Sequence, residues 1–148
     1  MSRRAEIVLT DAEIAQLLDE QRTLICATIG RDGWPHLMPL WYVVRDGECW
    51  SWTYAKSQKV RNLERDPRCT VQVETGEQYD ELRGVMIKAE AVIHRENVLE
   101  LGVEIFERYT GGPVDPEHLR GQAAKRVGLQ FVVREVASWD HRKLAGVH

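Results

Sequence analysis

A short segment in the middle of the chain could bind phosphate. Ser57 precedes an expected helix over residues 58–65, and Lys59 lies in its first turn. The first N–H groups of a helix have no intrahelical acceptor and lie at the positive end of the helix dipole, so Ser57 and Lys59 can together hold a phosphate. Arg61 could add a second cation. The competing interpretation, which this segment alone favours, is that Ser57 only caps the helix while Lys59 and Arg61 face solvent.

A proline-bearing segment upstream could accommodate a flat ring. Residues 33–42 read GWPHLMPLWY, and Pro39 removes one backbone N–H from the expected strand. Such a proline is tolerated where a strand borders an edge, a bulge or a ligand. Together with the aromatic segment 50–54, these strands could present backbone amides and hydroxyls to a planar heterocycle whose phosphate reaches Ser57. The alternative is that the aromatic residues form the core of a barrel, which is their commoner role.

The remaining reactive side chains form no recognisable catalytic or metal site. Cys26, Cys49 and Cys69 lie about twenty residues apart without a C-x-x-C pair, so we expect free, mostly buried thiols in a reducing cytosol. His36 stands near a turn and is interpreted as structural. We therefore predict no metal and leave the catalytic residue unassigned.

Length and composition indicate one domain over residues 1–148. A chain of 148 residues with 43% hydrophobic residues can bury a core without disulfides or metals. A net charge of −3 gives no general attraction to nucleic acid. No stretch approaches the ~20 apolar residues that a membrane span requires, so we expect a cytoplasmic protein with neither nucleic acid nor membrane as a partner.

The hydrophobic pattern predicts a mainly β protein with short helices. Strands are expected at residues 23–29, 34–44, 48–54, 68–74, 84–94 and 127–139, the first three forming a meander. Helices are expected at residues 11–21, 58–65, 96–109 and, more weakly, 116–125. Thr10 and Glu13 have the spacing of a capping box, and Asp46-Gly47 is a hairpin signal. Because α and β elements do not alternate strictly, a small closed barrel is favoured over a βαβ fold.

Several motifs, taken in order, resemble those of the pyridoxamine-phosphate-oxidase-like split β-barrel family. They are Ala27-Thr28-Ile29-Gly30, Gly33-x-Pro35-His36, Pro39-Leu40-Trp41, Lys56-Ser57-x-Lys59-x-x-Asn62-Leu63-x-x-Asp66-Pro67-Arg68, Tyr79-x-x-Leu82-Arg83-Gly84-Val85, and residues 138–144. The chain is most similar to the actinobacterial flavin/deazaflavin oxidoreductase group, subgroup B. Each motif alone is weak, but their order and spacing along nearly the whole chain are specific.

The resemblance implies a six-stranded antiparallel split β-barrel that forms a homodimer, with each cofactor between two protomers. By position, Ser57, Lys59 and Asn62 would serve the phosphate, supported by Lys56 and Arg61. The full set of implied cofactor-binding residues is Pro39, Leu40, Trp41, Thr53, Lys56, Ser57, Lys59, Val60, Arg61, Asn62, Tyr79, Arg83 and Trp139. Of these, Pro39, Leu40, Trp41 and Thr53 would flank the ring, largely through backbone atoms, while Tyr79, Arg83 and Trp139 would approach from the partner subunit.

The resemblance also implies an activity. We expect an oxidoreductase in which coenzyme F420, a deazaflavin, passes a hydride to a small planar unsaturated or carbonyl substrate. Lys56, Lys59, Arg61 and Arg65 could also meet the oligoglutamyl tail of that cofactor. Two alternatives stay open: an FMN-dependent oxidoreductase of the same fold, and a non-catalytic carrier of the cofactor. The chain lacks the Arg-Leu-x-Pro ending of the biosynthetic pyridoxamine phosphate oxidases, so pyridoxal phosphate synthesis is not expected.

Overall fold

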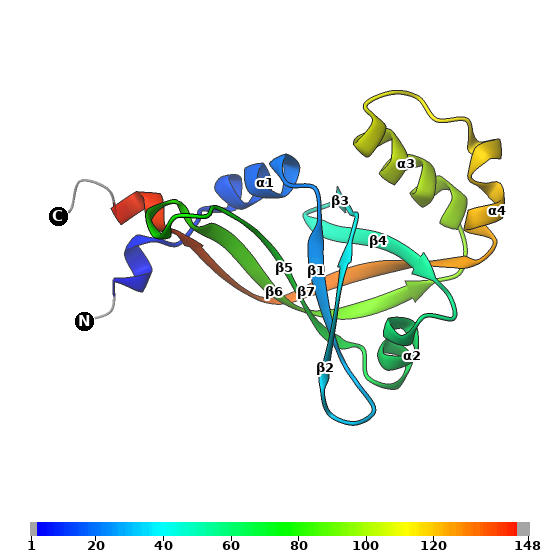
Figure 1. Ribbon diagram of the computed structural model, residues 1–148, viewed down its shortest axis with the longest axis horizontal. Helices are drawn as coiled ribbons and strands as arrows, with labels where there is room; N and C mark the ends of the chain where they lie inside the picture. The colour runs from blue at the N-terminus through cyan, green and yellow to red at the C-terminus, as the bar shows by residue number, and fades with distance from the viewer. Residues whose placement is uncertain (1–2, 145–148) are drawn as a thin grey trace.

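The computed structural model describes residues 3–144 as a curled antiparallel sheet with short helices around it (Figure 1). The strands are β1 (Leu24–Ile29), β2 (Pro35–Leu40), β3 (Val43–Arg45), β4 (Glu48–Tyr54), β5 (Arg68–Thr75), β6 (Arg83–His94) and β7 (Arg126–Asp140). The α-helices are α1 (Asp11–Glu20), α2 (Gln58–Arg65), α3 (Val98–Thr110) and α4 (Arg120–Ala123). In the sheet the strands follow the order β2-β1-β5-β6-β7-β4-β3.

The sheet has seven strands instead of the expected six because the chain turns a corner inside the expected strand 34–44. β2 and β3 lie at opposite edges of the sheet, yet only Trp41 and Tyr42 separate them in the sequence. The sheet must therefore curl until its edges approach each other. The hydroxyl of the fully buried Tyr42 donates to the carbonyl of Leu18 at 2.5 Å and holds the corner. The expected three-strand meander is divided at this point, because β2 pairs with β1 while β3 pairs with β4.

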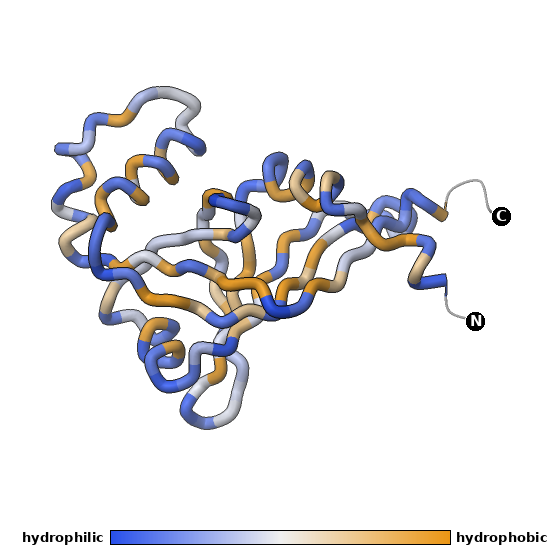
Figure 2. Tube along the Cα trace, turned by 180° about the vertical axis from the view of Figure 1, so that it is seen from behind, coloured by the Kyte–Doolittle hydropathy of each residue, from blue (hydrophilic) through white to orange (hydrophobic). Residues whose placement is uncertain are grey.

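The core lies inside the curl of the sheet. Alternate residues of β1, β5 and β6 point inward, as the two-residue period of a strand requires, and long hydrophobic runs follow the strands (Figure 2). Leu17 and Leu18 of α1 pack into the same core. Cys26, Cys49 and Cys69 are buried free thiols, as predicted. A second apolar cluster joins α3 to β4, where a Cβ on Gly102 would lie 2.3 Å from the ring of Trp52.

Local signals in the sequence are confirmed at the ends of several elements. Thr10 and Glu13 form the predicted capping box of α1. Asp46 and Gly47 have φ angles of 51° and 78°, the left-handed pair that a tight hairpin turn requires. Gly111 ends α3 with a φ of 78°. The expected helix 116–125 is shorter, because residues Pro116–His118 form a 3₁₀ turn and only α4 follows.

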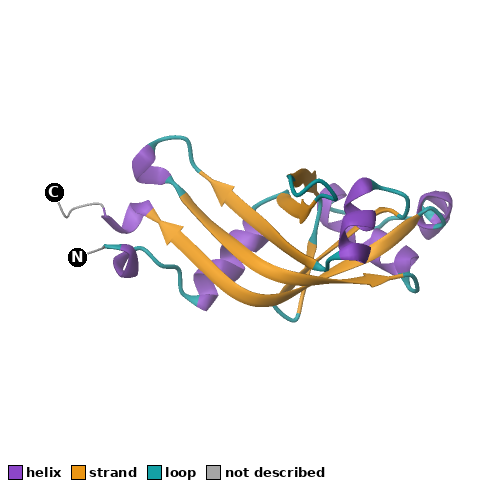
Figure 3. Ribbon diagram, turned by 90° about the horizontal axis from the view of Figure 1, so that it is seen from below, coloured by secondary structure: helices purple, strands orange, loops and turns teal. Residues whose placement is uncertain are grey.

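The antiparallel pair β6 and β7 is much longer than the other strands of the sheet and extends to a distal end (Figure 3). Short 3₁₀ helices over Tyr79–Glu81 and His141–Leu144 meet there, close to both ends of the described chain. No helix in the described range 3–144 is both long and apolar enough to cross a membrane.

Candidate functional site

A groove of about 300 Å³ lies beside the corner between β2 and β3. It is lined by Pro39, Leu40, Trp41, Trp52, Thr53, Tyr54, Phe106, Gln122 and Arg126. The four residues that the resemblance places around a cofactor ring, Pro39, Leu40, Trp41 and Thr53, are therefore brought together. Their assignment to a ring stays a prediction.

Two strands beside this groove each have an edge without a partner strand. β2 pairs only with β1, and β4 beyond Trp50 pairs only with β7. An unpaired edge presents backbone N–H and C=O groups that need other partners. Pro39 lies on such an edge, which is where a strand tolerates a proline. The site thus offers hydrogen-bonding groups on both sides of a narrow gap.

Aromatic rings from α3 hold one wall of the groove. The indole of Trp41 is stacked on Tyr109 with ring centroids 4.3 Å apart, and its other neighbour Phe106 meets it edge-on at 5.5 Å. The carbonyl of Trp41 accepts a hydrogen bond from Ser51 Oγ at 2.8 Å. Backbone and ring of Trp41 are both fixed before any ligand binds.

Arg126 lines the groove and was missed by the sequence analysis. Its guanidinium lies 4.1 Å from the ring centroid of Tyr54 and 4.9 Å from that of Trp52. It donates to the carbonyl of Gln122 at 3.2 Å and makes no ion pair with a carboxylate of the part of the chain that is described. The register that pairs Arg126 with Tyr54 joins residues far apart in sequence, so no local signal could have found it.

Lys59, the central residue of the predicted phosphate site, points into the barrel. Ser57 caps α2, accepting a hydrogen bond from the N–H of Val60 at 3.4 Å. The side chain of Lys59 is only 6% exposed, and its ammonium donates to Thr53 Oγ1 at 2.8 Å. Burial lowers the pKa of this amino group, since the charged form is the one that loses hydration. Within residues 3–144, no carboxylate pairs with Lys59.

The other predicted residues of this turn divide into buried and exposed ones. Asn62 is fully buried and donates from Nδ2 to Thr28 Oγ1 at 3.0 Å, so it joins α2 to β1. The side chain of Val60 belongs to the hydrophobic core. Lys56 and Arg61 are exposed. Lys59 and Asn62 therefore belong to the barrel side of α2, and Arg61 to its solvent side.

Two adjoining hollows lie on the solvent side of α2. One, of about 450 Å³, is lined in part by Arg31, Asp32, Trp34, His36 and Gln58. A neighbouring hollow shares Arg31 and Gln58 with it and adds Arg61, Glu64 and Arg65. His36 Nδ1 is buried there without a hydrogen-bond partner. Together the two hollows hold three arginines, Arg31, Arg61 and Arg65, and two carboxylates, Asp32 and Glu64.

Tyr79, Arg83 and Trp139 do not reach the groove within one chain. Arg83 pairs with Asp140 at one end of β7, whereas Arg126 begins the opposite end of that strand. Arg83 forms an ion pair with Glu20 at 2.6 Å, and the ring of Tyr79 lies against His141. The described residues also contain no group of three or more His, Cys, Asp or Glu side chains able to hold a metal ion.

Comparison with known proteins gives a family and a shared fold. A family model described as pyridoxamine 5'-phosphate oxidase matches residues 10–140. No curated protein matches the chain. A conserved hypothetical protein from Mycobacterium tuberculosis, whose crystal structure is known, is 47% identical, with a TM-score of 0.92 over 100% of this chain and 95% of that chain.

Two more distant structures show the fold alone. An F420 reductase is 20% identical, with a TM-score of 0.68 over 82% of this chain and 93% of its own. An FAD-binding protein from Mesorhizobium loti is 18% identical, with a TM-score of 0.65 over 88% of this chain and 94% of its own. The predicted split β-barrel is confirmed, with one strand more than expected.

Proposed function

The chain belongs to the pyridoxamine 5'-phosphate oxidase family, and from this premise we propose that it is an oxidoreductase that binds coenzyme F420 beside β4. One observation carries the proposal. The residues expected around the cofactor ring line one groove, and Thr53 in that groove is the sole hydrogen-bond partner of the buried Lys59 ammonium found within residues 3–144.

The groove suits a flat heterocycle. The free edges of β2 and β4 offer donors and acceptors in the plane of a ring, and Trp41 and Trp52 offer apolar contact. When bound, F420 supplies a hydride to an electron-poor double bond or carbonyl. The protein's share is to hold donor and acceptor in reacting geometry and to exclude water. We assign no proton donor among the side chains, and solvent can supply the proton.

Lys59 suits the phosphate. Among the residues that the structure describes, the buried Lys59 ammonium has one neutral hydrogen-bond partner and no carboxylate, whereas a buried charge is usually paired. A phosphate at the start of α2 would supply it, and the N–H groups of the first helical turn would add donors. In this proposal Lys59 exchanges Thr53 for the phosphate, while Asn62 keeps α2 seated on β1.

The two hollows on the solvent side of α2 favour F420 over FMN. Their three arginines, Arg31, Arg61 and Arg65, outnumber the two carboxylates, Asp32 and Glu64. F420 carries an oligoglutamyl tail after its phosphate, whereas FMN ends at the phosphate and would leave these arginines unused. The FAD-binding relative shows that the fold also accepts a flavin, so FMN stays the second candidate.

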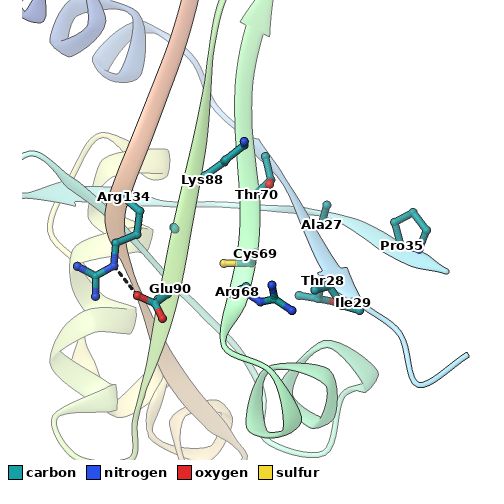
Figure 4. A pocket seen from close by; sticks show the side chains of 11 residues that line it. Ala27, Thr28, Ile29, Pro35, Arg68, Cys69, Thr70, Lys88, Glu90 and Arg134 are labelled. Carbon is teal, nitrogen blue, oxygen red and sulfur yellow. Dashed lines mark hydrogen bonds and ion pairs between the residues drawn. The ribbon is translucent and has the colours of Figure 1, made fainter. Parts of the chain in front are cut away.

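We further propose that two copies of the chain complete the site. A shallow groove of about 410 Å³ crosses the outer face of the sheet from β2 to β7 (Figure 4). The exposed Ile29 lines it together with charged residues of β5, β6 and β7, and the exposed Leu37 pairs with Ala27 of its lining. A second copy packed on this face could bring its distal Tyr79, Arg83 and Trp139 to the first copy's groove.

We also propose that the protein is located in the cytoplasm, because free cysteines such as Cys26, Cys49 and Cys69 are typical of that compartment.

Titration of the purified protein with F420 and with FMN tests the proposal. We expect F420 to bind at micromolar concentration or tighter and FMN to bind more weakly. Sedimentation analysis should give a dimer. If F420 does not bind at micromolar concentration, the proposal fails; if it binds but transfers no hydride to a panel of enones, quinones and nitroaromatics, the carrier alternative is supported.

A further inference from the structure

The charge of Arg126 has no partner inside the groove. Of the residues that line the groove, none is acidic, and Arg126 is the one that carries a charge. Its side chain is nevertheless ordered, because two aromatic rings and the carbonyl of Gln122 hold the guanidinium. A guanidinium fixed in this way keeps several N–H groups free for a ligand.

Arg45 shows how the same protein treats a stacked arginine that has a structural role. Its guanidinium lies 4.8 Å from the ring centroid of Trp50, much as Arg126 lies on Trp52. Arg45 also forms an ion pair with Glu104 at 2.6 Å, so its charge is balanced by α3. Arg126 has the aromatic contacts without the carboxylate. A neighbouring carboxylate is thus the difference between the two arginines, present beside Arg45 and not found beside Arg126 among the described residues.

The size and lining of the groove indicate what kind of anion would fit beside Arg126. Its volume of about 300 Å³ lies at the small end of ligand pockets. Four aromatic residues line it: Trp41 and Tyr54, which are exposed, Phe106, and Trp52, which is buried against Gly102. Rings of this kind stack on planar ligands, and a guanidinium binds a carboxylate through two parallel hydrogen bonds.

We propose that Arg126 and these aromatic residues form a subsite for a planar conjugated carboxylate that bears an electron-poor double bond or carbonyl. One carbon of that bond accepts the hydride from reduced F420, which is thereby oxidised, and the other atom takes a proton from solvent. The inference rests on the proposed function, since it assigns the acceptor to the side of the groove that faces α3 and α4. Phe106 and Gln122 come from that segment and would determine which rings enter. The cofactor would occupy the side nearer Pro39 and Lys59.

Isothermal titration with 2-naphthoate and its neutral counterpart 2-naphthamide tests the subsite directly. We expect naphthoate to bind and Arg126→Gln to weaken it about tenfold or more, as for loss of a charge-assisted hydrogen bond. Naphthamide affinity should change less than about twofold. Arg126→Lys should recover part of the naphthoate affinity, because it restores the charge but not the planar fork.

Arg120→Gln is the matched control. It removes one arginine charge from the same segment, but Arg120 is exposed and paired with Glu117, so naphthoate affinity should not change. Indole N–H signals of the wild-type protein give a readout that needs no variant: naphthoate should shift those of Trp41 and Trp52. Equal losses for the acid and the amide in Arg126→Gln, or equal losses in both arginine variants, would overturn the inference.

Separate titrations distinguish this inference from the proposed function. Naphthoate is titrated first without F420, so failure of F420 to bind leaves the subsite result intact. F420 is then titrated into Arg126→Gln, where we expect an affinity within about twofold of wild type, because Lys59 rather than Arg126 holds the phosphate in this account. A tenfold loss of F420 affinity with naphthoate binding unchanged would assign Arg126 to the cofactor and overturn the acceptor subsite.

Discussion

Lys59, which is buried, and Arg108, which is half-buried, are two basic side chains whose partners differ. The guanidinium of Arg108 on α3 donates to the carbonyls of Leu18, Gln21 and Tyr42. The ammonium of Lys59 on α2 donates to one neutral hydroxyl, that of Thr53. Arg108 thus satisfies the last carbonyls of α1, which are the negative end of a helix dipole. Lys59, by contrast, satisfies no backbone carbonyl that the structure describes and bonds only the Thr53 hydroxyl.

This difference separates a structural cation from a cation kept for a ligand. A half-buried charge with several hydrogen bonds stabilises the elements it connects, here α1, α3 and the corner between β2 and β3. A buried charge with a single neutral partner costs stability and is typical of a functional site. Replacing Arg108 should therefore lower the stability of the fold, whereas replacing Lys59 should lower the affinity for the cofactor.

Arg108→Met should have the largest effect on folding. It leaves the carbonyls of Leu18, Gln21 and Tyr42 without a charged donor, and we expect the free energy of unfolding to fall by about 3 kcal/mol. Urea denaturation measures this change. Arg22→Met is the control, because Arg22 is exposed and bonds a single carbonyl at 3.3 Å. A loss of unfolding free energy below about 1 kcal/mol for Arg108→Met would contradict the structural role assigned to Arg108.

Lys59→Met should affect binding instead. We expect F420 affinity to fall about thirtyfold, equivalent to about 2 kcal/mol, because a charge-assisted hydrogen bond to phosphate is lost. The free energy of unfolding without ligand should stay equal or rise, since a lone buried charge is replaced by an apolar chain of similar length. Fluorescence titration and urea denaturation of the same sample measure both. Unchanged F420 affinity, or a large loss of stability, would make Lys59 a structural residue like Arg108.

Asn62→Ala should show an intermediate, structural effect. Asn62 is fully buried and bonds Thr28, so its loss should lower the free energy of unfolding by about 1.5 kcal/mol. Thr28→Val removes the same bond, and a double variant should cost less than the sum of the two. Additive losses would show that the bond between Asn62 and Thr28 does not join α2 to β1.

The pH dependence of binding should give the smallest and most specific effect. Burial lowers the pKa of Lys59, so the ammonium loses its proton at a lower pH than an ordinary lysine does. F420 affinity should fall as pH rises through that lowered value, and the unliganded protein should gain stability over the same range relative to Lys59→Met. Lys59→Arg should keep its affinity there, because arginine stays charged. Identical pH profiles for wild type and Lys59→Arg would contradict this.

The parts of the fold that local sequence determines were predictable. The capping box of α1, the turn at Asp46 and Gly47, and the end of α3 at Gly111 depend on neighbouring residues. The corner at Trp41 was not predicted, because it is held by Tyr42 and its distant partner Leu18. A continuous run of apolar and aromatic residues, 37–44, passes through the corner, so the pattern alone suggests one long strand.

The same limit applies to the site. The sequence motif located Lys59 correctly in the first turn of α2, but did not show that its side chain enters the barrel to meet Thr53. Arg126 carried no motif, and its place beside Tyr54 follows from the pairing of β4 with β7. Residues that act through long-range strand pairing become visible only when the sheet order is known.

A crystal structure of the protein with F420 would test the central claim most directly. We predict the phosphate at the start of α2, within hydrogen-bond distance of the Lys59 ammonium, which will have left Thr53, and the ring along the edge of β2 at Pro39. A phosphate bound elsewhere, with Lys59 still donating to Thr53, would contradict the account.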